Sequence, residues 1–388
     1  MQPTLRFPEF KDEWSYNLFN NIVTNRSKKF NPSTEEATND IELDSIEQNT
    51  GRLLNTYMSN QFTSQKNIFN KNSVLYSKLR PYLNKYYYAQ IEGVCSSEIW
   101  VLNTLNKDVL SNKFLYYFIQ TNRFSSVANK SAGSKMPRAD WGLVENIRLY
   151  RGPIEEQEKI GEFFIKLDQQ IELEEKKLEL LKQQKKGYMQ KLFSQELRFK
   201  DENGNEYPNW QTVKIGSILK ERKERSGDGE MLSVTINHGI VKFDDIDRKD
   251  NSSKDKSNYK KVYKNDIAYN SMRMWQGASG KAEFDGIVSP AYTVVTPIEN
   301  INSSFIAYYF KTHNMIHKFR INSQGLTSDT WNLKYKQLKD IKISICSKEE
   351  QDKIANLLTI LDIRIKKQNH KLEILNINKK GLLQKMFV

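Results

Sequence analysis

The sequence has only two cysteines in 388 residues, Cys95 and Cys346. They do not occupy matching places in the repeat described below, so we expect small buried or neutral residues rather than a structural disulfide. No run of about 18 consecutive apolar residues exists for a membrane-spanning helix, and residues 1–10 contain no apolar segment for a signal peptide. We therefore expect a soluble, cytoplasmic protein.

Motifs for chemistry on DNA are also lacking. There is no G-x-x-x-x-G-K-[ST] phosphate loop, because GASGK at 277–281 is too short. No Gly-rich strand-to-helix turn for a methyl donor occurs, and no Asn or Asp precedes Pro-Pro-aromatic; the nearest approach, NPST at 31–34, is interpreted as a turn. These absences argue against an ATP-driven motor and against a methyltransferase.

Two residue pairs could suggest a metal or nuclease site, and both have simpler interpretations. His313 and His317 are one helical turn apart, a spacing that can bind zinc, but no other His or Cys is near in sequence. Surface or nucleic-acid-facing histidines fit better. Glu174 and Lys176 lie within an EEKK run of a predicted helix, where a solvated helix face is the better interpretation.

Positive charge is in excess. With 60 Lys and Arg against 47 Asp and Glu, the formal net charge is +13 and the pI about 9.3. Such a balance favours a polyanionic partner, because bound phosphates release counterions; DNA or RNA is favoured over an anionic membrane surface. The length fits two globular domains plus a connector.

The second half of the sequence repeats the first. At a constant offset of 194, residues 155–193 match residues 349–387 at eighteen of thirty-nine positions without a gap. Upstream, LRF, a tryptophan and YYF recur in the same order, at 5–7, Trp14 and 116–118 and again at 197–199, Trp210 and 308–310. The repeat is thus a variable globular portion of roughly 150 residues followed by a helical portion of roughly 40.

The helical portions carry an apolar seam with the alternating four and three spacing of a coiled coil. Polar residues break it at matching places, Glu174 and Lys185 in the first copy and Gln368 and Lys379 in the second, and such residues fix register. The seam positions are Ile160, Phe164, Leu167, Ile171, Leu178, Leu181, Ile354, Leu358, Leu361, Ile365, Leu372 and Leu375, continued by Tyr188, Leu192, Leu382 and Met386.

Two such helices separated by a globular portion can lie antiparallel. About 33 residues at ~1.5 Å each would form a rod of ~50 Å, longer than one DNA turn of ~34 to 36 Å. The pair would then be a spacer that sets two readers over separated DNA segments. The second helix should return toward the first domain, which predicts that Val388 lies near Leu5.

The globular portions are predicted to mix strands and helices. Strands are expected at 73–79, 98–104, 266–272 and 291–297, which are rich in β-branched and aromatic residues. Residues 113–129 and 304–319 show helical periodicity with an aromatic face. Polar tracts at 31–40 and 248–261 are expected to be loops.

The motifs, in their order, resemble the specificity subunit of Type I restriction-modification systems over the whole chain. They are LRFPEF with Trp14, EEQEKI before the central helix, the second LRF with Trp210, and EEQDKI before the terminal helix. The resemblance implies an α+β fold with two pseudo-symmetric mixed α/β target recognition domains separated by two long antiparallel coiled-coil helices. It places target recognition domains at 1–153 and 197–347, and helical spacers at 154–196 and 348–388.

The same resemblance implies a non-catalytic subunit that recognises a bipartite, asymmetric DNA sequence, one half per domain. Two methyltransferase subunits would dock through the helices, and a motor-nuclease restriction subunit would join the complex. No cofactor is expected in this chain; S-adenosylmethionine, ATP and magnesium are expected only in the partner subunits.

Base recognition needs bidentate side chains aimed at base edges from loops or strand ends. Two paired places satisfy this, a strand end and a Ser-x-Gly loop whose side chains differ between the copies while the glycine stays. For any single residue, a turn or a local ion pair remains an alternative. In the first half the candidates are Tyr76, Ser77, Lys78, Arg80, Ser131, Ser134, Lys135 and Arg138; in the second they are Tyr269, Asn270, Arg273, Ser323, Gln324, Thr327, Ser328 and Asp329.

Two rival functions remain at this point. A lone nuclease or methyltransferase with a divergent site would show activity as a purified chain. A structural adaptor that bridges partners through its coiled coil would not show salt-sensitive binding to duplex DNA.

Overall fold

The computed structural model describes residues 1–130, 136–246 and 255–388. It divides into two compact units: the first comprises Met1–Glu175 with His370–Val388, and the second comprises Lys176–Asn369. Two long helices, α5 (Ile154–Phe193) and α10 (Lys348–Met386), each contribute one part to each unit. Each helix begins at the first residue of the spacer expected from the sequence and ends two or three residues before the last one.

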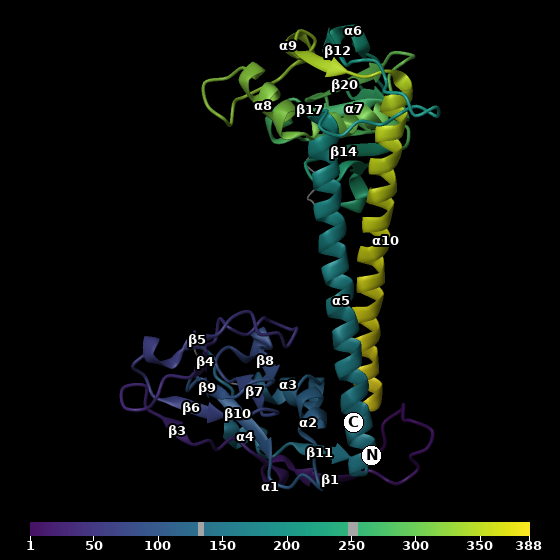
Figure 1. Ribbon diagram of the computed structural model, residues 1–388. Coiled ribbons are helices and arrows are strands. Elements are labelled where there is room, and N and C mark those ends of the chain that lie inside the picture. The colour runs from purple at the N-terminus through teal and green to yellow at the C-terminus, as the bar shows by residue number, and fades with distance from the viewer. Residues whose placement is uncertain (131–135, 247–254) are drawn as a thin grey trace. The chain divides into compact units, whose positions relative to one another are not determined.

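The globular part of the first unit contains three sheets (Figure 1). A four-stranded antiparallel sheet has the order β2 (Val23–Thr24), β10 (Ile99–Thr104), β7 (Val74–Ser77), β8 (Tyr86–Tyr88). A five-stranded sheet has the order β3 (Lys29–Phe30), β6 (Lys66–Phe69), β9 (Gly93–Cys95), β4 (Asn39–Ile41), β5 (Tyr57–Met58), and a two-stranded sheet pairs β1 (Ser15–Leu18) with β11 (Arg148–Arg151). The short helices are α1 (Phe19–Ile22), α2 (Asn112–Phe118), α3 (Asn122–Ala128), α4 (Trp141–Val144), η1 (Ser59–Gln61) and η2 (Pro81–Leu83).

The second unit repeats this plan. Its first sheet has the order β13 (Leu219–Glu221), β20 (Tyr292–Pro297), β17 (Ile267–Asn270), β18 (Ser279–Lys281), and its second β15 (Gly239–Lys242), β14 (Met231–Thr235), β19 (Gly286–Val288), β16 (Lys260–Val262). The two-stranded sheet pairs β12 (Gln211–Lys214) with β21 (Lys342–Ile345). The short helices are α6 (Ile215–Ile218), α7 (Ser303–Phe310), α8 (His313–Asn322), α9 (Tyr335–Leu338), η3 (Phe243–Asp245) and η4 (Met274–Gln276).

Strands β7 and β17, at equivalent places in the sheets β2-β10-β7-β8 and β13-β20-β17-β18, contribute side chains to cores on both faces. In β7, Val74 and Tyr76 belong to the core that includes α2, α3 and the long helices, whereas Leu75 belongs to a second core on the other face. In β17, Tyr269 and Ala268 divide between two cores in the same way. The sequence predicted these strands, and the burial of all their residues except the half-buried Asn270 decides below which side chains can reach a ligand.

Each of the two segments predicted to be helical with an aromatic face forms two consecutive helices. Residues 112–128 form α2 and α3, which meet near Thr121, the residue before α3; residues 303–322 form α7 and α8, which meet at Thr312. The Thr312 hydroxyl accepts the amide of Met315. The helical periodicity at 113–129 and 304–319 is therefore divided between two helices in each half, because a threonine at the N-terminal cap competes with helix continuation.

Within each unit the parts of α5 and α10 are antiparallel, as predicted. In the first unit Asp168 pairs with Lys379 at 2.6 Å and Glu174 pairs with Lys371, so numbers rise along one helix as they fall along the other. All twelve predicted seam side chains are buried or half-buried. Of the four polar residues at the seam breaks, Glu174, Lys185 and Lys379 form ion pairs, and Gln368 is buried.

The two ends of the chain meet in the first unit, where the labels N and C lie next to each other in Figure 1. The amide of Leu5 donates to the carbonyl of Lys385 at 3.0 Å, and Phe387 packs on Phe114 with ring centroids 4.6 Å apart. The predicted proximity of Leu5 to the end of the second helix is confirmed. In the second unit the amide of Leu197 makes the corresponding bond to the carbonyl of Lys191, also at 3.0 Å.

Candidate nucleic-acid interface

The LRF and EEQ motifs meet each other in both units. The Arg6 guanidinium donates two hydrogen bonds to the buried carboxylate of Glu156, at 2.8 and 2.7 Å, and the indole of Trp14 donates a third at 2.8 Å. In the second unit the Arg198 guanidinium donates two hydrogen bonds to the carboxylate of Glu350, at 3.2 and 2.7 Å. These motifs are therefore structural, because they fasten the start of each globular portion to the start of its long helix.

The glutamine of each EEQ motif adds a second fastening. Gln157, fully buried, donates to the carbonyls of Gly152 and Val109 and accepts the amide of Ser111, at 2.9, 3.0 and 3.1 Å. Gln351 accepts the amide of Asn302 at 2.9 Å in the same way. These bonds join the start of each long helix to the N-terminal cap of the aromatic helix α2 or α7 in the same unit.

In the first unit the structure brings together the two places predicted to contact bases. The amide of Arg80 donates to the carbonyl of Pro137 at 2.8 Å, and the amide of Ala139 donates to the carbonyl of Lys78 at 2.7 Å. Arg80 adopts a left-handed conformation with φ of 51°, which ends β7 and directs the chain into η2. The strand end and residues 137–139 therefore lie side by side, although they are about sixty residues apart in sequence.

The second unit builds the corresponding surface. The amide of Leu333 donates to the carbonyl of Ser271 at 2.8 Å, close in sequence to Arg273. Gln324 and Asn332 exchange backbone hydrogen bonds and so close the loop between them. The indoles of Trp275 and Trp331 pack edge to face with centroids 5.2 Å apart. The loop at 323–332 is thereby fixed against the end of β17.

Three of the predicted base-contacting residues are placed in the core instead. Tyr76, Ser77 and Tyr269 are 2%, 2% and 0% exposed, so their side chains cannot reach a base edge. Burial raises the pKa of both tyrosines above the ordinary value, which keeps them neutral. The structure corrects the prediction here: these residues lie in strands with two buried faces, and their role is to hold the loops that follow.

The remaining candidates lie at or near the surface. Lys78 is half-buried, whereas Arg80 and Arg273 are exposed. Arg138 is exposed and pairs with Glu98 at 3.0 Å, a contact that raises its pKa. Gln324, Thr327, Ser328 and Asp329 are exposed, Asn270 and Ser323 are half-buried, and Ser131, Ser134 and Lys135 lie outside the described residues.

Several residues of these surfaces were missed by the sequence reasoning. Leu326 is fully exposed at the tip of its loop, beside Gly325 with φ of 148°, and Met272 and Tyr82 are largely exposed next to the two arginines. Trp331 is half-buried under the guanidinium of Arg320, 5.5 Å from the ring centroid. Apolar side chains in turns give no periodic signal, so only the proximity of Leu326 to the Ser-x-Gly motif could have indicated it.

Neither metal chemistry nor membrane insertion is supported by the described part of the chain. Its His, Cys, Asp and Glu side chains form no group of three or more that could hold a metal ion. None of the helices in this part is both long and apolar enough to cross a bilayer. His313 and His317 occupy the exposed start and the middle of α8.

The family of the chain follows from comparison with known proteins. The model of the Type I restriction modification DNA specificity domain matches residues 18–183 and 207–376, one copy in each half. The chain therefore belongs to this family, whose members are the non-catalytic specificity component of Type I systems. The predicted resemblance is confirmed, as are the two-domain mixed α/β fold and the absence of an enzymatic role.

Individual relatives match over part of their length. The chain is 28% identical over 156 residues to the specificity subunit of the Type I restriction enzyme EcoDI of Escherichia coli, covering 39% of this chain and 34% of the relative. It is 29% identical over 133 residues to the MjaVIII specificity subunit of Methanocaldococcus jannaschii, covering 33% and 31%. These matches span about a third of each curated relative.

Solved structures share the fold over nearly the whole chain. The S subunit from M. genitalium has a TM-score of 0.59 at 17% identity and covers 100% of this chain and 99% of its own. The HsdS subunit from Thermoanaerobacter tengcongensis has a TM-score of 0.51 at 16% identity, with 96% of each chain covered. A third, with a TM-score of 0.57 at 15% identity and 99% of each chain covered, comes from work on complex assembly and conformational transition of the type I R-M system.

Proposed function

We propose that this chain recognises a bipartite, asymmetric DNA target, one half-site per unit, and directs methyltransferase and restriction subunits to it. The observation that carries the proposal is the pair of equivalent surfaces at the ends of β7 and β17. Each is built on the same scaffold and presents an arginine at the same place, Arg80 and Arg273, while the neighbouring side chains differ. A shared scaffold with different side chains suits two readers of different half-sites.

The excess of positive charge supports DNA as the ligand. Arginine pairs with the O6 and N7 atoms of guanine, and Gln and Asn pair with adenine, so Arg80, Arg273 and Gln324 have the chemistry for base edges. Lysines elsewhere on the units would contact phosphates. The test is binding of the purified chain to duplex DNA between 50 and 200 mM salt; a steep fall in affinity is expected, and salt-independent or absent binding would contradict the proposal.

The long helices provide faces for partner subunits. In the first unit Leu173, Ile374 and Ile377 are exposed on them, and in the second unit Leu180, Ile360 and Ile363 are exposed. Leu173 and Leu180 on α5 continue at heptad spacing to Gly187. On α10, Ile374 lies one heptad before Gly381, and Ile360 lies two heptads before Ile374. Heptad-spaced apolar residues outside the buried seam fit a further helix of a partner chain.

The two glycines strengthen this proposal. A Cβ atom at Gly187 or Gly381 would have no atom of the described chain within 4 Å, whereas one at Gly161 would lie 2.5 Å from Lys113. Glycine within a helix costs ~0.5 to 1 kcal/mol relative to alanine. Because no described residue lies against these two glycines, they fit close approach by the partner, one methyltransferase subunit per unit.

Docking at the glycines can be tested directly. Gly187→Leu and Gly381→Leu should each weaken binding of the methyltransferase subunit to the full chain while leaving DNA binding unchanged. Glu179→Leu is the control, because Glu179 is exposed on the same helix but does not share the face of Leu180 and Gly187. Equal effects of the control and the glycine variants would contradict the assignment. S-adenosylmethionine, ATP and magnesium belong to the partner subunits in this proposal, and the complex acts in the cytoplasm.

A further inference from the structure

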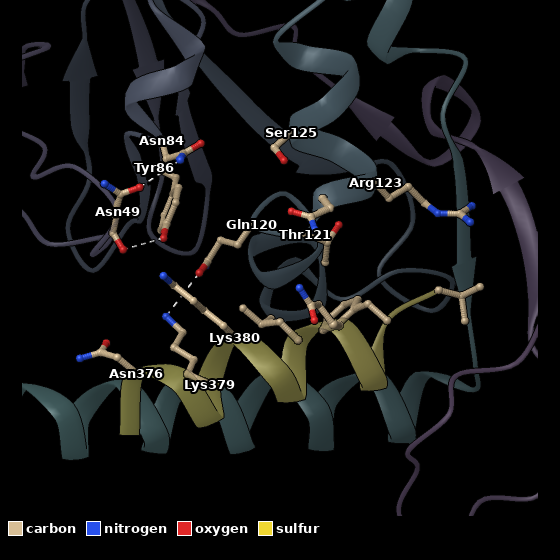
Figure 2. A pocket seen from close by; sticks show the side chains of 15 residues that line it. Asn49, Asn84, Tyr86, Gln120, Thr121, Arg123, Ser125, Asn376, Lys379 and Lys380 are labelled. Atoms are coloured by element: carbon tan, nitrogen blue, oxygen red, sulfur yellow. Dashed lines mark hydrogen bonds between the residues drawn. The ribbon is translucent and has the colours of Figure 1, made fainter. Parts of the chain in front are cut away.

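Each unit contains a hollow between the last turns of a long helix and the corner of the two aromatic helices. In the first unit it measures about 530 Å³ and lies between α10 and the α2–α3 corner (Figure 2). In the second it measures about 790 Å³ and lies between α5 and the α7–α8 corner. The two share a lining at repeat-equivalent positions: Lys379, Lys380, Leu383, Gln384, Phe387 and Thr121 in one, and Lys185, Lys186, Met189, Gln190, Phe193 and Thr312 in the other.

The charge of both hollows is positive. Among the described residues that line them none is Asp or Glu, although the chain has 47 acidic residues. Arg123 joins the two lysines of the first hollow, and Lys182 and Lys311 join those of the second. Burial, together with the charge of Lys185, lowers the pKa of Lys311 to about 8, as expected where cations crowd.

One lysine of each pair forms an ion pair, and the other forms none with the residues that the structure describes. Lys379 pairs with Asp168 and Lys185 with Asp362, both at 2.6 Å. Lys380 and Lys186 are exposed. Figure 2 shows Lys379 and Lys380 rising from α10 toward Gln120 and Tyr86, on the far side of the hollow.

The hollows are linked to the proposed base-reading arginines through a single turn in each unit. Arg80 is the N-terminal cap of η2, and Asn84, its C-terminal cap, lines the first hollow. Arg273 is the N-terminal cap of η4, and the carbonyl of Gly277, its C-terminal cap, accepts the amino group of Lys311 at 2.5 Å. A group held in the hollow would therefore be placed in a fixed relation to the arginine.

We propose that each hollow binds a phosphate of the DNA backbone and thereby sets the register of the neighbouring arginine on its half-site. The inference rests on the proposed function. The side chains beside Arg80 and Arg273 differ between the units, whereas the hollows are repeated, so their ligand must be the same in both halves. Backbone phosphates are the same whatever the sequence, and contacts to them position a protein without specifying bases.

The test measures how the affinity of the full chain for duplex DNA depends on salt. Each phosphate contact contributes ~0.9 to the slope of log K against log salt. Lys186→Gln and Lys380→Gln should each lower the slope by about that amount, and the double variant by about twice as much. The loss should be the same on target and non-target duplexes, while the ratio of the two affinities stays unchanged.

Control variants separate the hollow from general charge and from folding. Lys177→Gln removes an exposed lysine of the same helix outside the hollow and should leave the slope unaltered, as should Lys186→Arg, which keeps the charge. A slope as steep in the Lys186→Gln and Lys380→Gln variants as in the unsubstituted chain would overturn the inference. The inference would also be overturned if these two variants kept the salt slope of the unsubstituted chain but bound the methyltransferase subunit more weakly. The hollow would then hold an acidic group of that partner.

The two possible failures are distinguishable. If the unsubstituted chain binds duplex DNA with a steep salt dependence that none of the variants changes, only the phosphate assignment fails. If the unsubstituted chain shows no salt-dependent binding at all, the proposed function fails with it.

Discussion

Lys185 and Asp362 form an ion pair 2.6 Å long between α5 and α10 in the second unit, and Lys379 and Asp168 form its counterpart of the same length in the first. These lysines are the ones that interrupt the apolar seam. A shift of either helix by one residue would separate each pair and place a lysine against apolar side chains. Each pair therefore specifies the register and the antiparallel direction of the helices.

Each pair also connects the helices to the globular portion of its unit. The hydroxyl of Tyr308 donates to Asp362 at 2.7 Å, and the amino group of Lys185 lies 5.1 Å from the centroid of the same ring. Asp362→Lys alone should destabilise the second unit by about 1 kcal/mol, and adding Lys185→Asp should recover part of the loss. Urea unfolding of the four proteins of this cycle measures the coupling.

An exposed pair in the same unit is the control for that cycle. Lys214 and Asp340 are 3.0 Å apart, but both side chains are 58% exposed. The same exchange there should give a coupling near zero, because solvent screens exposed pairs. Equal coupling in both cycles would show that the seam pair has no special role.

The buried carboxylate of Glu156 should dominate the stability of the first unit. Glu156→Ala leaves the guanidinium of Arg6 and the indole of Trp14 without their acceptor, and breaking a buried pair from one side costs ~3 to 5 kcal/mol. Glu155→Ala, at the exposed neighbouring position, should cost less than ~0.5 kcal/mol. Denaturant unfolding followed by the near-ultraviolet signal tests this, and similar losses for both variants would contradict it.

The pKa of Lys311 predicts a pH dependence of stability in the second unit. It is lowered to about 8 in the folded protein, against ~10.4 in an unfolded chain. Between these two values the unfolded state holds more protons at this position than the folded state, so the free energy of unfolding should rise with pH. The difference in stability between the unsubstituted protein and Lys311→Met should therefore increase from pH 8 to pH 10; a constant or decreasing difference would be contrary to the assignment.

Arg80 and Arg273 should each affect one half-site. Arg80→Ala is expected to lower discrimination at one base pair of the first unit's half-site by ~1 to 3 kcal/mol, because a bidentate contact is lost. Arg80→Lys should also lose discrimination but keep more affinity, since lysine keeps the charge without the fork geometry. Competition binding with duplexes substituted one base pair at a time measures both, and the Glu98-paired Arg138 provides a comparison at the same surface.

Local sequence patterns were sufficient for the helices but not for the contacts that orient them. The seam from Ile160 to Leu192 is visible because side chains three and four residues apart share a helix face. The contact between Arg6 and Glu156 joins residues 150 positions apart, and no local pattern reveals it. The repeat compensated in part, because LRF and EEQ recur together in both halves.

Which side chains of a predicted strand are exposed at the candidate site cannot be predicted from the strand alone. The composition of residues 73–79 predicts a strand but not which of its faces are covered, and Val74, Leu75, Tyr76 and Ser77 are all buried. Whether the second face of a sheet is covered depends on the five-stranded sheet packed there, which is a tertiary property. Arg80 was predicted as a base-contacting residue at the strand end, and its side chain is exposed there.

The central claim is that two equivalent units recognise two separate DNA segments. Its most direct test is co-expression of this chain with a methyltransferase subunit, followed by mapping of every methylated site in the host genome. The account predicts a target of two short specific segments separated by unspecified bases, with Arg80→Ala relaxing one segment and Arg273→Ala the other. A single continuous target, or a change of both segments by either substitution, would contradict it.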